Sequence, residues 1–212
     1  MTPKEIRNEK LGTKLVKNLQ RRNFNAFYCS NSQQAIEKVM QLMPESSSVT
    51  WGGTMTLRDM GLIQALYDSN IYELLDRDKA PDRDAVNEIY RRTFSADFFL
   101  SSANAISEDG VIVNIDGNGN RVAAITFGPK SVIIACGMNK VVRSVQDAET
   151  RARTIAAPIN AQRFDLTTPC VTTGRCSDCK NTQSICSVIS RIRLSKPTGR
   201  IKVVLIGENL GF

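Results

Sequence analysis

The sequence predicts an α/β domain of three layers, built on a mostly parallel β-sheet with one added β-hairpin. Runs typical of strands alternate with runs typical of helices along most of the chain, which is the pattern of a parallel sheet covered by helices. Two runs, SVIIACG (131–137) and VVLIG (203–207), are apolar throughout or nearly so, as strands buried on both faces are. The 212 residues contain no long linker, so we expect one domain, residues 1–212, with a substantial core.

The N-terminal half alternates predicted helices with predicted strands. Residues 1–22 carry apolar side chains at steps of four or five with basic residues between them, which predicts a basic amphipathic helix. Residues 32–43 form the third predicted element, a helix with Ser32 as its N-cap and Pro44 just beyond its end. In order, the expected elements are helix 1–22, strand 23–30, helix 32–43, strand 46–51, helix 54–68, strand 71–76 and helix 84–92.

The second half contains the strongest local turn signal. Residues 111–128 hold two runs of partial alternation on either side of Asp-Gly-Asn-Gly-Asn, which predicts a β-hairpin. The preceding segment, 95–110, has the pattern of a strand, a polar loop and a short helix. After the buried strand 131–137, a helix is expected from about Ser144 to Ala157, and a buried strand ends the chain.

Composition and charge exclude several classes of function. The net charge of +7 comes from basic segments at residues 1–22 and 175–202, but no nucleic-acid-binding motif accompanies them and aromatic residues are few, so nucleic acid is not an expected partner. The chain has no histidine, which excludes Ser-His and Cys-His nucleophile pairs. No signal peptide and no run of about 20 apolar residues is present, so a cytoplasmic protein without a membrane span is expected.

Two glycine-containing patterns lack the context that would make them ligand sites. The glycines near residue 117 lie in the predicted hairpin turn and not between a strand and a helix, so a dinucleotide-binding fingerprint is unsupported. The same turn resembles a calcium-binding loop, but Arg121 stands where that loop requires glycine and Phe127 where it requires a carboxylate.

Four of the six cysteines fall within seventeen residues of a polar segment, with the spacing C-x5-C-x2-C-x6-C. They lie in a loop expected over residues 168–190, before the last strand, and are Cys170, Cys176, Cys179 and Cys186. A C-x2-C step can direct two sulfurs at one ion, and two more cysteines nearby can complete a shell of four thiolates. Without histidine, a zinc site here would be all sulfur, and an iron–sulfur cluster held by four thiolates is equally compatible.

Other interpretations of the cysteines stay open at this point. Disulfides would suit a secreted protein, Cys176 and Cys179 could cycle between dithiol and disulfide, and the thiols could all be free. Cys29 and Cys136 are a separate case, because each lies in an apolar stretch where cysteine behaves as a small core side chain.

Several of these segments together resemble the lactate-utilisation (LUD) domain family. The resemblance rests on VTWGGTMTLRDMGL, SADFFLSSANAISEDGVIVNIDGNGNR, ITFGPKSVIIACGMNKVV with the following QDAETRARTIAAP, and RIKVVLIGENLGF. It implies a fold similar to that of sugar-phosphate isomerases and CoA-transferases. It also implies a link to the use of lactate or a related 2-hydroxy acid, beside iron–sulfur proteins.

The loops at the carboxyl ends of the predicted strands are the expected ligand site, because ligands of α/β sheets bind there. Backbone N–H groups, hydroxyls and a lysine in these loops could hold a phosphate or carboxylate. The candidate binding residues are Gly52, Gly53, Thr54, Ser101, Asn104, Asn139 and Lys140. Glu108 is the candidate catalytic carboxylate, since carboxylates perform the chemistry in the isomerases and transferases that the chain resembles.

Two functions therefore compete. In the first, the domain binds a small anionic metabolite in this pocket and acts in lactate or 2-hydroxy-acid utilisation. In the alternative, it is a non-catalytic accessory subunit that carries an iron–sulfur cluster or zinc and works with an iron–sulfur protein partner. Whether a second copy of the chain is also a partner stays open.

Overall fold

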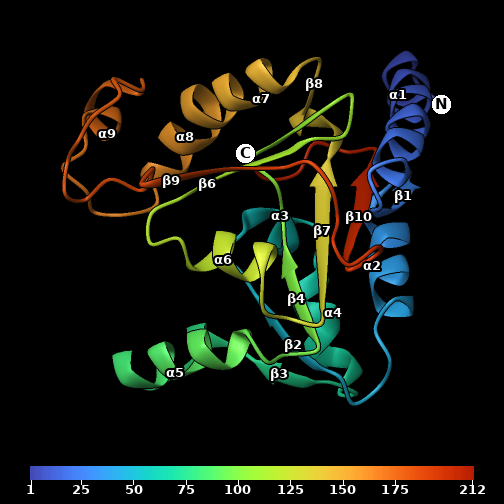
Figure 1. The fold of residues 1–212 in the computed structure, drawn as a ribbon, viewed down its shortest axis with the longest axis horizontal. Helices are drawn as coiled ribbons and strands as arrows, with labels where there is room; N and C mark the ends of the chain where they lie inside the picture. Colours follow the sequence, from blue (N-terminus) through green and yellow to red (C-terminus); the bar gives the residue numbers. More distant parts are fainter.

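The computed structural model describes residues 1–212 and contains two β-sheets packed with helices (Figure 1). All pairings in the larger sheet are parallel. From one edge to the other, its strands are β1 (Asn25–Cys29), β10 (Ile201–Ile206), β7 (Ser131–Gly137), β4 (Phe98–Ser101), β2 (Ser48–Trp51) and β3 (Glu73–Leu75). Every residue of β7 and β4 is buried, because these central strands are covered on both faces.

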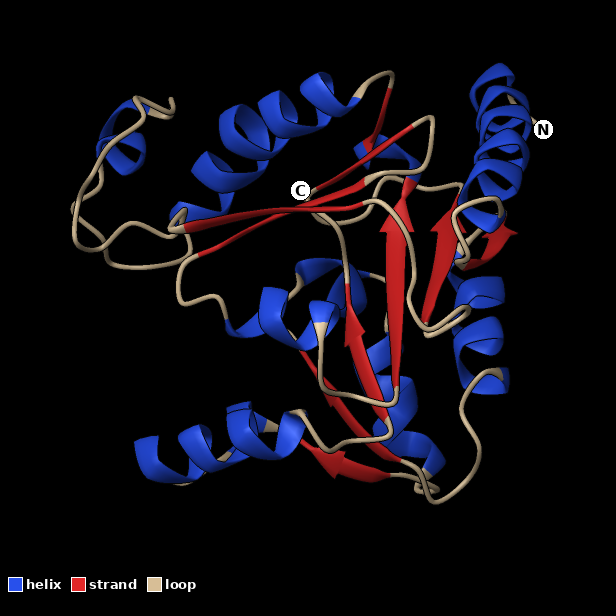
Figure 2. Cartoon of the chain, in the orientation of Figure 1, coloured by secondary structure: helices blue, strands red, loops and turns tan.

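A smaller sheet of four strands lies across the carboxyl ends of the larger one (Figure 2). In spatial order its strands are β8 (Val141–Val142), β5 (Ala105–Ser107), β6 (Ile112–Asp116) and β9 (Val188–Ile192). The central pair, β5 and β6, is antiparallel, as is β6 with β9, whereas β5 and β8 are parallel. Since β5 directly follows β4 and β8 follows β7, the two sheets meet where the strands of the first one end.

Helices cover both faces of the larger sheet, which confirms the three-layer α/β prediction. One face packs against α2 (Ser32–Gln41), α3 (Met55–Asp59) and α4 (Leu62–Ser69), through core residues such as Val39, Leu57 and Leu66. The opposite face packs against α1 (Pro3–Gln20) and α6 (Asn120–Thr126), through Leu15, Leu19 and Ile125.

The outer face of the smaller sheet is covered by one interrupted helix. It consists of α7 (Val145–Arg151), a π-helical turn η3 (Ala152–Ala156) and α8 (Ala157–Ala161). Ala148 and Ala152 pack on Val113 and Ile115 of the sheet. The remaining helical elements are η1 (Arg77–Lys79), α5 (Arg83–Thr93), η2 (Met138–Lys140) and α9 (Pro169–Thr173). None of the helices combines the length and apolar character needed to cross a bilayer.

The predicted hairpin over residues 111–128 is wrong. Its first run is β6, but its second run is helix α6, which begins after Gly119 in the left-handed conformation (φ 79°). The carboxylate of Asp116 accepts hydrogen bonds from the N–H groups of Gly119 (3.1 Å) and Val122 (3.3 Å), so it fixes a strand-to-helix turn. The partners of β6 are β5 and β9 instead. Two consecutive alanines, good helix formers, had weakened the alternation that suggested a strand.

Two further local predictions need correction. The short helix expected near the end of 95–110 is strand β5, which pairs with β6 and β8, because long-range pairing overrides a weak local pattern. The N-cap of α2 is Asn31 rather than Ser32, and its side chain accepts a hydrogen bond from the Gln34 N–H (3.0 Å). The expected helix from Ser144 is present with Ser144 as its N-cap.

Candidate functional site

A polar pocket lies where the carboxyl ends of the parallel strands meet the smaller sheet. Its volume is about 80 Å³. It is lined by residues from six separate parts of the chain: Gly53, Thr54, Met55, Thr56, Ser102, Ala103, Asn104, Ile115, Arg121, Lys140, Asn160, Arg163 and Phe212. We call this the anion pocket, because three cationic side chains and no Asp or Glu side chain line it.

Lys140 is the buried cation of the anion pocket. It ends η2, directly after β7, and only 2% of it is exposed. Its ammonium donates to the hydroxyl oxygens of Thr56 (2.7 Å) and Ser102 (3.1 Å), neither of which carries a compensating charge. Burial lowers the pKa of Lys140 to about 8; Cys136 opposes this shift, whereas Arg151 and Arg121 add to it. The nearby charge of Asp59 also opposes the shift, but no acidic side chain forms an ion pair with Lys140.

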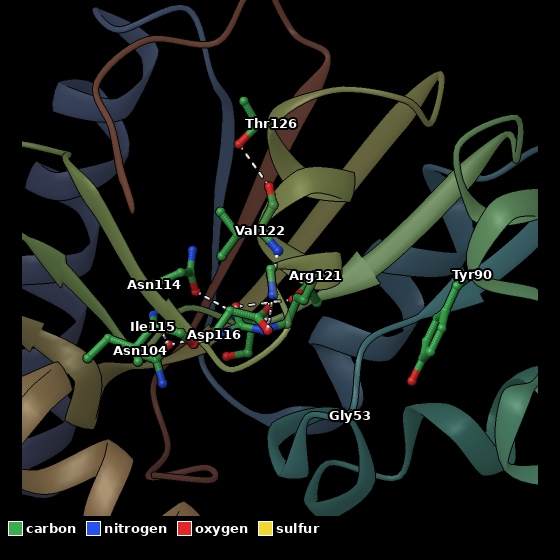
Figure 3. A network of polar contacts seen from close by, with 12 residues as sticks. Gly53, Tyr90, Asn104, Asn114, Ile115, Asp116, Arg121, Val122 and Thr126 are labelled. Atoms are coloured by element: carbon green, nitrogen blue, oxygen red, sulfur yellow. Dashed lines mark hydrogen bonds and ion pairs between the residues drawn. The ribbon is translucent and has the colours of Figure 1, made fainter. Parts of the chain in front are cut away.

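Arg121 anchors the wall of the pocket from the first turn of α6 (Figure 3). Its guanidinium donates to the side-chain oxygens of Asn114 (2.6 Å) and Asn104 (3.1 Å) and to the backbone oxygens of Ile115 (2.6 Å) and Ser102 (3.2 Å). Its Nε lies 3.5 Å from the Asp116 carboxylate, and its side chain is 16% exposed. Burial lowers the pKa of Arg121. The guanidinium of Arg121 is thus engaged in hydrogen bonds with other residues of the chain. It adds positive electrostatic potential to the pocket and holds its neighbours in place.

Asn104 offers a free donor in this network. Its side-chain oxygen accepts from Arg121 and from the Ile115 N–H (2.9 Å), which fixes the amide orientation. The amide nitrogen makes no hydrogen bond within the chain and belongs to a residue that lines the pocket. Thr54 has a similar role, since its hydroxyl does not cap α3.

Arg163 is the exposed cation at the edge of the pocket. One of its nitrogens donates to the Gly53 carbonyl (3.3 Å) and to the Asn160 side chain (3.0 Å). The pKa of Arg163 is lowered by burial and by the nearby charges of Arg58 and Arg77. Its remaining N–H groups are without a partner in the chain, so they are available to an anion.

The glycine pair after β2 is needed for close packing. The Gly52 N–H bonds to the Leu100 carbonyl (3.0 Å), and a Cβ on Gly52 would lie 3.0 Å from Cδ of Arg121. A Cβ on Gly53 would overlap the guanidinium of Arg77. Gly53 lines the anion pocket, whereas Gly52 lines a small neighbouring cavity.

Four of the eight predicted ligand and catalytic residues line the anion pocket: Gly53, Thr54, Asn104 and Lys140. Ser101 is fully buried beside it, and its hydroxyl donates to the Ser102 carbonyl (3.2 Å). Asn139 instead binds the C-terminal segment, with its side chain bonded to the Gly211 carbonyl (3.2 Å) and the Leu210 N–H (3.2 Å).

Glu108 lies elsewhere, in the turn between β5 and β6. Its N–H donates to the Val142 carbonyl (2.8 Å), and its own carbonyl accepts from the side chain of Asn18 (2.8 Å). It does not line the anion pocket. Among the pocket side chains, the one that can accept a proton near neutral pH is Lys140.

Arg121, Arg163, Asn160 and Ser102 line the pocket but are not among the predicted site residues. Arg121 directly follows the turn of the predicted hairpin, and no binding role is predicted for it. Arg163 follows α8, about twenty residues after η2 in sequence. The chain has more basic than acidic residues. Because a site for an anion needs positive charge, this excess is the sequence feature that could have indicated the arginines.

A wider cleft adjoins the anion pocket. Its volume is about 430 Å³, and it shares Gly53, Ile115, Arg121 and Asn160 with the pocket. Tyr90 stands on its far wall (Figure 3) and accepts a hydrogen bond from Arg77 (3.1 Å). The cleft gives a bound molecule room to extend beyond the anionic group held in the pocket.

The four clustered cysteines line one cavity, which we call the cysteine cavity. Its volume is about 70 Å³, and all four side chains are half-buried. The cavity lies between the segment around α9 and the start of α8, with Arg153, Ala157 and Pro158 on the helix side. Burial, together with the charges of Cys176, Cys170 and Cys179, raises the pKa of Cys186 to about 11. No group of three His, Cys, Asp or Glu side chains is placed to hold a single metal ion.

Cys29 and Cys136 are both buried core residues, as predicted. Burial raises the pKa of each thiol. Neither lines the cysteine cavity.

Comparison with known proteins agrees with this architecture. The crystal structure of a DUF162 family protein from Deinococcus radiodurans superposes with a TM-score of 0.54 at 12% sequence identity, covering 94% of this chain and 98% of that one. At this identity the likeness establishes the fold. No curated protein matches the sequence. The family model described as the LUD domain matches residues 12–206, nearly the whole chain. The chain therefore belongs to the LUD domain family, a family related to lactate utilisation.

Proposed function

We propose that the anion pocket binds the carboxylate of a small metabolite, lactate or a related 2-hydroxy acid. The observation that carries this proposal is Lys140, a buried lysine whose partners are two neutral hydroxyls. A buried ammonium without a counterion is costly, and a bound carboxylate would supply the missing charge. Membership of the LUD domain family favours a 2-hydroxy acid as the source of that carboxylate.

Different residues of the pocket would contact the carboxylate and the hydroxyl of such a ligand. Lys140 and Arg163 supply charge-assisted hydrogen bonds to the carboxylate, which are about twice as strong as neutral ones. Asn104 and Thr54 supply a free amide N–H and a free hydroxyl near the same space, and these suit a 2-hydroxyl group. Arg121 keeps Asn104 oriented and adds positive potential. The neighbouring cleft would receive the rest of a larger substrate.

Isothermal titration calorimetry of the full chain tests this proposal. The probes are L-lactate, D-lactate, glycolate and pyruvate, with lactamide as a neutral analogue of lactate. We expect at least one acid to bind and lactamide to fail, because it lacks the charge that Lys140 needs. Lys140→Met should weaken acid binding about tenfold to a hundredfold, since a hydrogen bond to a charged group contributes about 1.5–3 kcal/mol.

Matched controls separate the pocket from general surface charge. Lys130→Met and Arg143→Ala remove exposed cations that do not line the pocket and should leave the affinity unchanged. The proposal fails if none of the acids binds the wild-type protein, or if Lys140→Met binds as tightly as the wild type.

The cysteine cavity favours a second candidate function, that of an accessory subunit that carries electrons for a 2-hydroxy-acid oxidising partner. Four thiols around one cavity are a specific arrangement that the anion pocket does not explain. This role predicts that the protein with its metal centre exchanges electrons with an iron–sulfur partner protein when the two proteins are mixed. Absence of electron exchange with any such partner would argue against it.

A further inference from the structure

The cysteine cavity is separate from the anion pocket, and its candidate metal ligands are all cysteine sulfurs. Four sulfurs line it, contributed by the short helix α9, the loop after it and the residue two positions before β9. Soft thiolates select zinc, cuprous copper and iron–sulfur clusters over the hard cations that prefer oxygen ligands. The four sulfur ligands therefore favour a thiophilic metal ion or cluster as the group that binds in the cavity.

A cluster and a single ion require different arrangements of the four sulfurs. Zinc requires all four sulfurs at about 2.3 Å from one point, and no three candidate ligands in the structure converge in that way. In a four-iron cluster each cysteine binds a different iron, so the sulfurs surround a group of several atoms. The four thiols around the cavity of about 70 Å³ provide the four separate ligands that such a cluster needs.

The loop that carries the cysteines is held by hydrogen bonds that do not involve sulfur. The side-chain oxygen of Gln183 accepts from the Thr167 N–H (2.7 Å) and hydroxyl (2.9 Å), and Asn181 donates back to the Thr167 carbonyl (3.3 Å). Gln162, just after α8, donates to the Cys170 carbonyl (3.1 Å). Arg153 forms an ion pair with Asp178 between two of the cysteines. The cavity thus has a framework before any metal binds.

The surroundings of the sulfurs also suit a cluster. Thr168 places its hydroxyl 3.4 Å from the Cys170 sulfur, and hydrogen bonds to cluster sulfurs tune its potential. Arg153 lines the cavity and can offset the negative charge of a cluster held by four thiolates. Apolar walls at Pro158, Ile185 and Ile189 limit the access of water.

The cavity shares a wall with the cleft beside the anion pocket. Ser184 and Ile185 line both spaces, and a Cβ on Gly117, in the turn after β6, would lie 3.1 Å from Cα of Ile185. One segment of chain therefore separates the cysteine cavity from the cleft where a metabolite would extend. A centre in the cavity is close enough to that cleft to affect its shape and charge.

We propose that Cys170, Cys176, Cys179 and Cys186 ligate a four-iron iron–sulfur cluster in the cysteine cavity. This deepens the second candidate function above and is independent of anion binding. Each cysteine loses its proton on ligation, and the cluster assembles from two ferrous ions, two ferric ions and four sulfide ions, so that no further oxidant is needed. Failure of the cluster would leave the anion pocket untouched, and a cluster that exchanges no electrons with a partner would leave this proposal standing.

Anaerobic reconstitution of the full chain with equal amounts of ferrous and ferric iron and with sulfide tests the proposal. We expect about four iron and four sulfide per chain, a broad visible absorption, and an electron paramagnetic resonance signal after reduction with dithionite. Cys176→Ser with Cys179→Ser should lose all three. Cys29→Ala, which removes a thiol outside the cavity, should retain them.

Two results would overturn the proposal. One is tight binding of a single zinc per chain in protein that takes up no iron; the other is a wild-type protein that binds neither metal. Circular dichroism of each variant reports whether it folds, and the metal content of the wild type decides the question even if the double variant does not fold.

Discussion

The anion pocket and the cysteine cavity are built in opposite ways. The anion pocket draws its residues from positions 53 to 212, and most of them lie at a strand end or in or next to a helix of the α/β fold. The four cysteines of the cavity come from one stretch of seventeen residues. Its loop is held by hydrogen bonds close to the cysteines, such as that between Gln183 and Thr167. The positive charge of the anion pocket therefore depends on the fold, whereas the sulfur donors of the cysteine cavity are specified by their spacing in the sequence.

The largest expected effect comes from Arg121, which ties the anion pocket to the fold. Arg121→Met should lower the free energy of unfolding by about 3–5 kcal/mol, because it leaves the buried carboxylate of Asp116 and several oxygens without their cationic partner. Urea unfolding followed by circular dichroism measures this. The control Arg143→Ala, on an exposed arginine, should change the free energy by less than about 0.5 kcal/mol. An equally small change for Arg121→Met would show that the network does not hold the pocket.

The contrast between a pocket assembled by the fold and a cavity specified by local spacing also explains how much of each could be predicted from the sequence. The strand runs of β7 and β10 were visible because continuous apolar segments signal strands buried on both faces. The cysteines were visible because their spacing is local. Gly53, Thr54, Asn104 and Lys140 were found by the rule that ligands gather at the carboxyl ends of parallel strands.

The residues that the sequence could not place depend on long-range contacts. Arg121 reaches the pocket because the segment after β6 turns into helix α6, and that turn depends on Asp116. Glu108 is predicted near the pocket because it closely follows Asn104 in the sequence, but pairing of β5 with β6 places Glu108 in the turn between these two strands instead. Local patterns carry no information about such pairings.

The next largest effect is a pH dependence of anion binding that belongs to Lys140. Its pKa is lowered to about 8, so the charged form that binds a carboxylate is lost as the pH rises through 8. The affinity for the acid that binds should be level from pH 6 to 7.5 and then fall by up to about tenfold per pH unit. Calorimetry across this range measures the profile.

The free protein should change in the opposite direction over the same range. In the unfolded chain Lys140 keeps its ordinary pKa of 10.5, so between pH 8 and 10.5 the unfolded state binds more protons and the contribution of Lys140 to stability rises with pH. The difference in urea stability between the wild type and Lys140→Met isolates this contribution from other groups. A binding profile that stays flat to pH 10 would contradict the assignment of Lys140 as the anion's partner.

The smallest expected effect is at the cysteine cavity of the metal-free protein. Cys176→Ser with Cys179→Ser should change the free energy of unfolding by less than about 0.5 kcal/mol under reducing conditions, because these half-buried thiols make no hydrogen bond to the framework of Gln183 and Thr167. The same double variant should bind the acid as the metal-free wild type does. After reconstitution, the wild type should gain thermal stability that the variant lacks, since a ligand bound to the folded state stabilises it. A loss of more than about 2 kcal/mol in the metal-free variant would mean that the thiols are packing residues, and the contrast between a folded pocket and a locally specified metal site would not hold.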